Sequence, residues 1–442
     1  MKIQIKKSTI VKPAEKTAAT NLYLSTIDLT VPNFYTLIAY FYRPNGAVNF
    51  FDTKLIKDGL SKALVAFYPM AGRFKKDKHG RFVIDCQEQG VLFVEAESDG
   101  VIEDFGDFSP SLELQKLTPN VDCSLGIESC PLLITQVTHF KCGGVSVGIG
   151  LHHFVADGVA ELHFIKSWSD MVRGVDLTLQ PFIDRTVLRA RDPPQPIFEH
   201  TEYRPCPYPP TKSSSLKDES DETPIASIFK LTRDQLNVIK AKSKEGGNTN
   251  IYGSFEMLAA HIWRSVCKAR GLLDDQVTTL VIPVDGRTRL EPALPPGYFG
   301  NVILVVPTTE VVGELQSNPM WYAANKIHDT IVLRNNAYYR SAIDYLELQP
   351  DIMAVSQGAN MFRYPNLGIS SWTGLSVYDV DFGWGQPIFM GPTSIAFEGI
   401  CYVIPNPIND GSISVVLSLQ AQHMKLFSNI FYEIFINDSS KL

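Results

Sequence analysis

The stretch from Gly150 to Gly158 joins a predicted β-strand to a predicted α-helix. Hydrophobic residues alternate with small or polar ones from Val145 to His152, which is the period of two expected of a strand. Hydrophobic residues then recur every three or four positions from Leu162 to Val172, and Gly174 follows them, as expected of an amphipathic helix with a glycine stop. A strand, a turn and a helix therefore follow one another, which predicts an α/β arrangement and leaves His153 as the first residue beyond the strand.

His153 is the side chain at this corner whose chemistry best suits catalysis. Neutral imidazole has an ordinary pKa close to physiological pH, so His153 can act as a general base. The alternative is a structural histidine that only makes hydrogen bonds, and the corner alone favours that alternative. Asp157 lies beside Gly158 and is expected to turn away and fix the bend. Strand alternation directs His152 to the opposite face, where packing is its expected role.

Length and composition indicate a folded protein with more than one core. A chain of 442 residues exceeds the size of one ordinary hydrophobic core, so two domains are expected. Hydrophobic residues make up 45% of the chain and charged residues 20%, which is typical of a globular enzyme rather than a disordered chain. The net charge of −7 and the lack of a Lys/Arg-rich block argue against a nucleic-acid partner.

A change of composition near the middle of the chain marks the expected domain boundary. Seven of the 28 prolines fall between Pro193 and Pro210, and a serine run and a charged run follow them. Proline stiffens a chain whereas serine and charge loosen it, so residues 192–224 are interpreted as a crossover linker. Residues 1–191 and 225–442 then form an N-terminal and a C-terminal domain. Both alternate strand and helix patterns, which predicts a mixed sheet in each.

The N-terminus and the cysteines bear on the cellular setting. The first residues alternate charge and hydrophobe without the apolar core of a signal peptide, and no apolar run reaches the roughly 18 residues of a membrane helix. We therefore expect a cytoplasmic protein without membrane insertion. The cysteines are scattered, odd in number and free of C-x-x-C pairs, so they are interpreted as buried thiols of a reducing cytosol, with no zinc or iron–sulfur site. They are Cys86, Cys123, Cys130, Cys142, Cys206, Cys267 and Cys401.

A second motif far along the chain makes the corner more informative. His153 to Gly158 has the pattern H-x-x-x-D-G, and Asp381 to Gly385 has the sequence D-F-G-W-G. Three further stretches accompany them: Tyr68–Arg73, Val284–Arg289 and Gly297–Asn301. In this order the motifs resemble those of the BAHD family of plant CoA-dependent acyltransferases, over essentially the whole chain. Within that family the resemblance is strongest to the hydroxycinnamoyl-CoA shikimate/quinate hydroxycinnamoyltransferases.

The resemblance implies a fold and a reaction. The fold is two chloramphenicol-acetyltransferase-like domains with an active-site channel between them. The reaction is acyl transfer from a CoA thioester, used as co-substrate, by a monomer with no permanently bound cofactor or metal. His153 would take the proton from the hydroxyl or amine of the acceptor, which then attacks the thioester without a Ser or Cys nucleophile. Trp372 and Ser371 are candidate donors to the oxyanion that forms.

Other residues are expected to shape the site without reacting. The resemblance pairs Asp157 with Arg287 of the second domain, an arrangement that suits the forked guanidinium, and two unconnected surface charges are the alternative. Ser254 is expected to cap the helix that follows it, so the free N–H groups there are a candidate site for the CoA phosphates. The D-F-G-W-G stretch is expected to be a tight structural loop beside the CoA channel. Its residues with that role are Asp381, Gly383 and Trp384.

The acceptor side of the chain departs from the family pattern. In relatives that take shikimate or quinate, an Arg follows the Trp-Thr pair and holds the acceptor carboxylate, but this chain has Gly374 there. The family's His and Ser on the channel segment are replaced by Tyr35 and Ile38, while Thr36 and Tyr40 remain polar. These changes predict transfer of an aromatic, hydroxycinnamoyl-type acyl group to a small hydroxyl or amine acceptor other than a polyhydroxy acid. Two alternatives stay open: shikimate or quinate transfer with another cation replacing the Arg, and a non-catalytic module that binds CoA esters.

Overall fold

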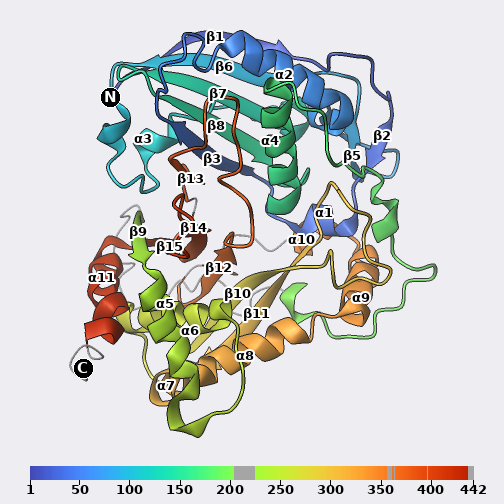
Figure 1. Cartoon of the computed structure of the whole chain (residues 1–442). Helices are drawn as coiled ribbons and strands as arrows, with labels where there is room; N and C mark the ends of the chain where they lie inside the picture. Colours follow the sequence, from blue (N-terminus) through green and yellow to red (C-terminus); the bar gives the residue numbers. More distant parts are fainter. Residues whose placement is uncertain (204–223, 356–360, 363, 396, 437–442) are drawn as a thin grey trace.

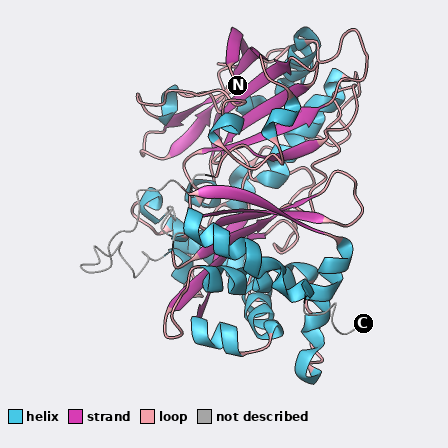
Figure 2. Ribbon diagram, turned by 90° about the vertical axis from the view of Figure 1, so that its left-hand side faces the viewer, coloured by secondary structure: helices cyan, strands magenta, loops and turns pink. Residues whose placement is uncertain are grey.

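The protein consists of two stacked halves, each built on a six-stranded sheet (Figure 1, Figure 2). The structure is a computed structural model and describes residues 1–203, 224–355, 361–362, 364–395 and 397–436. Helices alternate with strands in both halves, and each sheet contains parallel and antiparallel pairs. The expected α/β class with a mixed sheet in each half is confirmed.

The N-terminal sheet carries the strand that leads to His153. Its order is β1–β6–β7–β8–β3–β13, in which β6 and β7 run parallel and the other neighbours antiparallel. Helices α2 (Thr53–Ala66) and α4 (Gly158–Val172) cover one face and share a core with it (Figure 1). The strands are β1 (Ile3–Val11), β3 (Tyr35–Tyr42), β6 (Val91–Ser98), β7 (Leu133–Phe140), β8 (Val145–His152) and β13 (Phe389–Pro392).

The C-terminal sheet has the order β11–β10–β12–β14–β15–β9. Its strands are β9 (Ile225–Leu231), β10 (Val277–Asp285), β11 (Ile303–Val311), β12 (Leu367–Ser371), β14 (Ile400–Pro405) and β15 (Ile413–Leu419). The helix expected after residue 254 is present, and its buried residues pack into the core of this half. The helices of this half are α5 (Arg233–Ala241), α6 (Ser254–Ala269), α7 (Val312–Ser317), α8 (Met320–Val332), α9 (Asn336–Glu347), α10 (Ile352–Val355) and α11 (Ala421–Ile436).

Short elements complete the N-terminal half. A three-stranded sheet has the order β2–β5–β4 and flanks the main sheet. The helix α1 precedes β3 and begins with a capping box, in which Ser25 and Asp28 satisfy each other's backbone amides. These elements are β2 (Asn21–Tyr23), α1 (Thr26–Thr30), β4 (Arg73–Lys76), β5 (Phe82–Asp85) and α3 (Leu112–Gln115).

The two halves exchange chain segments, which corrects the expected boundary. β13 comes from the C-terminal part of the sequence but pairs with β3 in the N-terminal sheet, with Phe389 opposite Phe41. The segment 372–392 therefore crosses from one half to the other (Figure 1). In return, Ile27 of α1 is buried in the C-terminal core. Residues 225–442 are thus not one self-contained domain, because pairing between distant strands leaves no trace in local periodicity.

The expected linker is only partly within the described residues. Of residues 192–224, the part from 204 to 223 lies outside them, including the serine run and the charged run. The preceding part packs against α9, where the hydroxyl of Ser341 accepts hydrogen bonds from the amides of Ile197 and Phe198 at 2.9 and 3.0 Å. This stretch is therefore held against the C-terminal half.

The expectation that every cysteine is a buried thiol is wrong in part. Cys123 and Cys130 form a disulfide with their Cα atoms 5.8 Å apart, inside the range that a disulfide spans. Cys142 is an exposed thiol, and Cys206 lies outside the described residues. Spacing alone could not reveal the bonded pair, because the path of their shared loop decides it. The described cysteines that are buried thiols, as expected, are Cys86, Cys267 and Cys401.

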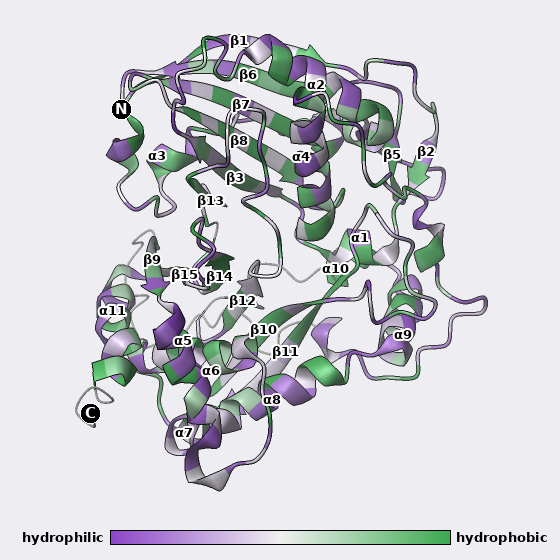
Figure 3. Cartoon of the chain, viewed as in Figure 1, coloured by the Kyte–Doolittle hydropathy of each residue, from purple (hydrophilic) through white to green (hydrophobic). Residues whose placement is uncertain are grey.

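Hydropathy follows this architecture. Helices such as α2 and α8 alternate hydrophobic and hydrophilic residues, as expected of helices with one face on a sheet (Figure 3). β8 and β15 are buried along their whole lengths. Within the described ranges, none of the helices combines the length and the apolar character needed to cross a bilayer.

Candidate active site

The corner predicted after β8 is present and is held from several sides. Asp157 is the N-cap residue of α4, and its carboxylate accepts a hydrogen bond from the amide of Ala160 at 3.1 Å. The amide of His153 donates to the carbonyl of Phe34 at 3.0 Å, which ties the corner to the chain just before β3. The Phe34 ring also meets the imidazole edge-on, with 6.3 Å between ring centres. The imidazole is therefore placed by backbone and ring contacts together.

The environment of His153 favours the neutral imidazole. Burial lowers its pKa below the ordinary 6.5, while its own carbonyl, the charge of Asp157 and the side chain of Asn301 act in the opposite direction. A histidine with a lowered pKa keeps a free lone pair at neutral pH, which a general base requires. Position and protonation state are both compatible with proton abstraction.

Asp157 also joins the two halves of the molecule. Its Oδ2 and Oδ1 accept hydrogen bonds from Nη1 and Nη2 of Arg287 at 2.9 and 2.8 Å, which is a fork geometry. Oδ2 accepts a further bond from the amide of Val302 at 3.1 Å. Asp157 is only 1% exposed, so its side of the pair is buried. The ion pair between Asp157 and Arg287 that the family resemblance implies is therefore present. The alternative, two unconnected surface charges, is wrong.

A second buried network holds the corner and was not foreseen from the sequence. Nδ2 of Asn301 donates to the carbonyl of His153 at 2.9 Å and to Oδ1 of Asp28 at 3.0 Å. Arg185 pairs with the same carboxylate oxygen at 3.0 Å and donates to two carbonyls of the turn after His153. Asn301 ends one of the recognised motifs, but a residue type does not show which carbonyl its amide reaches. Asp28 and Arg185 carried no sequence signal for this role.

His152 packs away from the corner, as strand alternation predicts. Its Nε2 lies 3.0 Å from Oδ1 of Asn33, and its ring meets that of Phe74 edge-on with 4.6 Å between centres. Burial, with a smaller contribution from the neighbouring His153, lowers the pKa of His152 to about 3. His152 is therefore a neutral packing residue.

The D-F-G-W-G stretch is a tight loop packed on the N-terminal half. The Asp381 carboxylate accepts hydrogen bonds from the amides of Gly383 and Gly385 at 2.7 and 2.9 Å. Both glycines have a positive φ, of 104° and 107°, which other residues rarely adopt. Phe382 and Trp384 are buried in the core that includes α2 and α4. Asp381 thus serves the loop itself, and the position of the loop beside a CoA channel stays a prediction.

Ser254 does not cap α6, which corrects the expectation. The N-cap residue is Gly253, whose amide donates to the carboxylate of Glu256. The other oxygen of Glu256 lies 2.9 Å from Nδ1 of His328. A carboxylate already occupies the positive end of this helix, so a CoA phosphate would meet like charge there. The sequence favours serine because serine is a commoner N-cap residue than glycine. The signal for Gly253 is Glu256, three residues later, whose carboxylate accepts from the Gly253 amide.

Trp372 and Ser371 lie where β12 ends, at the junction of the two halves. The amide of Trp372 donates to the carbonyl of Val403 at 2.7 Å, which leaves the indole N–H as its available donor. The Ser371 hydroxyl lies 2.9 Å from that of Thr373. The Trp372 ring packs against the N-terminal core across the junction. The role of both residues as oxyanion donors stays a prediction.

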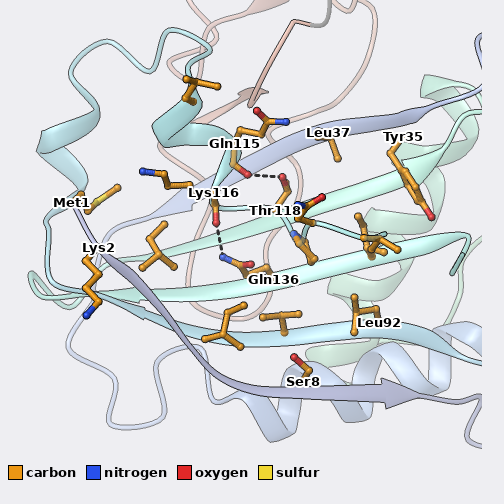
Figure 4. Close-up of a pocket in the computed structure, with 18 of the residues that line it drawn as sticks. Met1, Lys2, Ser8, Tyr35, Leu37, Leu92, Gln115, Lys116, Thr118 and Gln136 are labelled. Atoms are coloured by element: carbon orange, nitrogen blue, oxygen red, sulfur yellow. Dashed lines mark hydrogen bonds between the residues drawn. The ribbon is translucent and has the colours of Figure 1, made fainter. Parts of the chain in front are cut away.

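The expected acceptor residues of β3 divide between its two faces. Thr36, Ile38 and Tyr40 share the face toward α4, and the last two belong to the core on that side. Tyr35 points to the opposite face, where its hydroxyl donates to the carbonyl of Pro131 (Figure 4). Neighbouring residues of a strand point opposite ways. Tyr35 and Ile38 therefore lie on opposite faces of β3, and the role of each toward an acceptor stays a prediction.

A cavity of about 900 Å³ lies on the face of the N-terminal sheet opposite α4 (Figure 4). The amide nitrogen of Gln136 donates to the carbonyl of Lys116 at 3.0 Å within it. His153 and the residues of α4 do not belong to its lining. The cavity therefore does not contain the imidazole, although its lining includes Phe34, whose ring meets that of His153. Its lining includes Lys2, Tyr35, Leu37, Lys116, Thr118 and Gln136.

Gly374 lies in the exposed turn after β12. A Cβ atom added to it would meet no atom within 4 Å, so a larger side chain fits. The next residue, Leu375, approaches the start of α4, because a Cβ on Gly158 would lie 3.7 Å from its Cδ1. The turn therefore reaches the neighbourhood of the corner, and a side chain at residue 374 would project into open space beside it.

Glu161 is a residue near the corner that the sequence analysis missed. It lies one helical turn beyond Asp157, and its Oε2 accepts a hydrogen bond from the Thr36 hydroxyl at 3.2 Å. The residue is only 7% exposed. Burial raises its pKa to about 8, the Thr36 hydrogen bond opposes this shift, and the charge of Asp157 adds to it. An acidic residue four positions after Asp157, on the same face of the helix, was the available signal.

Comparison with known proteins identifies relatives along the whole chain. The model of the Transferase family matches residues 1–434. A shikimate O-hydroxycinnamoyltransferase of Nicotiana tabacum is 60% identical over 441 residues, which cover 98% of this chain and 100% of the relative. A hydroxycinnamoyl-CoA:5-hydroxyanthranilate N-hydroxycinnamoyltransferase of Avena sativa is 46% identical over 446 residues, with the same shares of 98% and 100%.

Solved structures share the fold. Vinorine synthase superposes with a TM-score of 0.73 at 19% identity, over 96% of each chain. F. graminearum TRI101, in complex with coenzyme A and T-2 mycotoxin, superposes with a TM-score of 0.74 at 18% identity, over 92% of this chain and 96% of the other. Fold, motifs and relatives together define a CoA-dependent acyltransferase. The chain belongs to the Transferase family, that of the BAHD enzymes, and has its chloramphenicol-acetyltransferase-like architecture.

Asp157→Ala should destabilise the protein strongly, because it leaves Arg287 without its buried partner and α4 without its cap. Breaking a buried pair costs about 3–5 kcal/mol, and losing a cap costs about 1 kcal/mol. Asp285→Ala is the matched control, since Asp285 contacts the same guanidinium at 3.1 Å but its side chain is 41% exposed. The control should lose less than about 1 kcal/mol. Urea unfolding measures both losses, and equal losses would contradict the structural role of Asp157.

Proposed function

We propose that the protein transfers an aromatic, hydroxycinnamoyl-type acyl group from CoA to a small hydroxyl or amine acceptor, with His153 as general base. The observation that carries this proposal is the partly buried imidazole of lowered pKa, held at the corner by hydrogen bonds to the backbone of His153. The relatives of 60% and 46% identity support the acyl group, since both are named hydroxycinnamoyltransferases. One is named for O-transfer and the other for N-transfer, so their names leave the acceptor open.

The proposed mechanism moves one proton through one imidazole. His153 takes the proton of the acceptor as its oxygen or nitrogen attacks the thioester carbonyl, which forms a C–O or C–N bond. The carbonyl oxygen becomes an oxyanion, for which the indole of Trp372 and the hydroxyl of Ser371 are the proposed donors. Collapse of this intermediate breaks the C–S bond, and the CoA thiolate takes the proton back from His153. No covalent acyl-enzyme is required.

The acceptor is proposed not to be a polyhydroxy acid. Gly374 provides no guanidinium for a carboxylate, and Ile38 presents an apolar side chain on the face toward α4. A lost hydrogen bond to a charged partner is worth about 1.5–3 kcal/mol, which corresponds to roughly tenfold or more in affinity. Thr36 and Tyr40 keep polar groups on the same face of β3.

A second candidate is transfer to shikimate or quinate with another cation in place of the missing Arg. The observation in its favour is the name of the Nicotiana tabacum relative, a shikimate O-hydroxycinnamoyltransferase of 60% identity. A third candidate, a non-catalytic module that binds CoA esters, has less support, because His153 and Asp157 both keep their contacts. Incubation with p-coumaroyl-CoA and a broad acceptor panel distinguishes it: tight binding without consumption of the thioester would favour the module.

His153→Ala and His153→Asn should each reduce acyl transfer by about 10²–10⁴-fold, the usual effect of removing a general base. The affinity for p-coumaroyl-CoA should stay within about threefold, since the imidazole acts on the acceptor proton. Steady-state kinetics and a binding titration measure the two effects separately. His152→Asn is the control, because His152 packs on the other side of the strand. Wild-type rates in a folded His153 variant would refute the mechanism.

Gly374→Arg should shift acceptor preference toward shikimate or quinate, because it supplies the missing cation in open space. The kcat/KM for shikimate relative to a neutral aromatic alcohol should rise about tenfold, and adding Ile38→Ser should increase it further. Gly374→Gln controls for size without charge. If the wild type already prefers shikimate by a wide margin, the acceptor argument fails and the second candidate replaces it.

A further inference from the structure

Glu161 and Tyr40 lie on the α4 side of the N-terminal sheet, and each has a buried polar atom without a hydrogen-bond partner. Oε2 of Glu161 is bonded to Thr36, but its Oε1 has no hydrogen-bond partner among the described residues, and neither has the hydroxyl of Tyr40. Tyr40 lies on the same face of β3 as Thr36, the residue that bonds Glu161, and burial followed by the charges of Glu161 and Tyr378 raises the pKa of Tyr40. Buried polar atoms without partners are uncommon, so each requires an explanation.

Among the residues that the structure describes, none forms an ion pair with Glu161. The guanidinium of Arg287 is taken by Asp157 and Asp285. Within the described part of the chain, Glu161 has one hydrogen bond, from Thr36, and no cation. Burial raises its pKa to about 8, which favours the protonated carboxyl over the ionised one when no cation is bound. Ionising it favourably therefore requires a cation from outside the chain.

The helix dipole does not explain this glutamate. Acidic residues in the first turn of a helix are stabilised by about 0.3–1 kcal/mol, and Glu161 is in the first turn of α4. An exposed glutamate would gain the same stabilisation from the helix dipole without losing the water around its carboxylate. Burial of the side chain and the unpartnered Oε1 point to a ligand instead.

We propose that Glu161 binds a protonated amino group of the acceptor, and that the acceptor is a small aliphatic diamine or polyamine. This inference rests on the proposed function and names the acceptor class for it. An ammonium group has three donors, and the Glu161 carboxylate and the Tyr40 hydroxyl offer free acceptors for them. The second nitrogen, in its neutral form, is then the nucleophile whose proton His153 takes. The glycine at position 374 agrees with a pocket that has no cation for an acidic acceptor.

The proposed reaction is amide formation and balances without a further reactant. The neutral amine attacks the thioester carbonyl, so a C–N bond forms and the N–H proton passes to His153. The C–S bond breaks, and the thiolate receives that proton to give free CoA. The proton displaced from Glu161 when the ammonium binds goes to solvent and returns when the product leaves.

The test compares 1,4-diaminobutane with pentylamine, in which a methyl group replaces the second nitrogen, using p-coumaroyl-CoA as donor. The wild-type kcat/KM should be at least tenfold higher for the diamine. Glu161→Gln should reduce this preference at least tenfold, and Glu161→Asp should retain part of it. The ratio is taken within each variant, so a general loss of activity divides out. Glu113→Gln, an exposed charge on α3, is the control and should leave the ratio unchanged.

Proton release gives a second readout that needs no variant. Binding of 1,4-diaminobutane at pH 7 should release about one proton more than binding of pentylamine, because the carboxyl of Glu161 loses its proton to the cation only with the diamine. Calorimetry in buffers of different ionisation enthalpy measures the difference. Equal proton release, or a diamine preference that survives Glu161→Gln, overturns the inference.

The outcomes also separate this inference from the proposed function. Acylation of shikimate or a neutral alcohol without preference for the diamine leaves the general-base mechanism in place and overturns the role of Glu161. Absence of acylation with every acceptor overturns both. Acylation of the diamine with loss of preference in Glu161→Gln supports both.

Discussion

The carboxylate of Asp157 accepts hydrogen bonds from the amides of Ala160 and Val302 and from both terminal nitrogens of Arg287. Ala160 is in the first turn of α4, Val302 directly precedes β11 in the C-terminal half, and Arg287 is in the turn after β10. A carboxylate satisfied in this way is stable when buried, whereas one that loses its partners is strongly unfavourable. This side chain therefore joins the two halves at the corner, together with the contact of Asn301 with the carbonyl of His153.

The same corner contains a carboxyl in the opposite situation. Asp157 is bonded on all sides, while Glu161, one turn further along α4, has one hydrogen bond and a raised pKa. His153, four residues before Asp157, is partly buried and has a lowered pKa. Groups whose environments move their pKa values apart in this way are typical of sites that bind and transfer protons. The paired acid holds the structure together, and the unpaired one is available to a ligand.

The sequence predicts local structure well where one period dominates. The strand before His153 and the helix after Asp157 both follow from the spacing of residues within a few turns. The features that it misses are relations between distant residues. Insertion of β13 beside β3, the contact of Asn301 with the carbonyl of His153 and the Cys123–Cys130 disulfide depend on the path of the chain.

Errors within single elements have simpler causes. Matching Tyr35 and Ile38 to positions of a family pattern does not show that they occupy opposite faces of β3. Ser254 was chosen as a helix cap by residue type, although Gly253 occupies that position and Glu256 supplies the carboxylate. Glu161 was overlooked because a lone acidic residue in an amphipathic helix is usually exposed. The sequence does not show which side chains are buried or which way they point, and these errors follow from that.

The claim on which the account depends is that neutral His153 is the base. The most direct measurement is the pH dependence of kcat/KM for p-coumaroyl-CoA transfer to a neutral alcohol, in the wild type and in His153→Asn. Protonation removes the lone pair, so activity should fall on the acidic side with a midpoint below the ordinary histidine pKa of 6.5, because burial lowers the pKa of His153. The acidic limb should be absent from the residual activity of His153→Asn. A midpoint well above 7, or the same limb in the variant, would contradict the assignment.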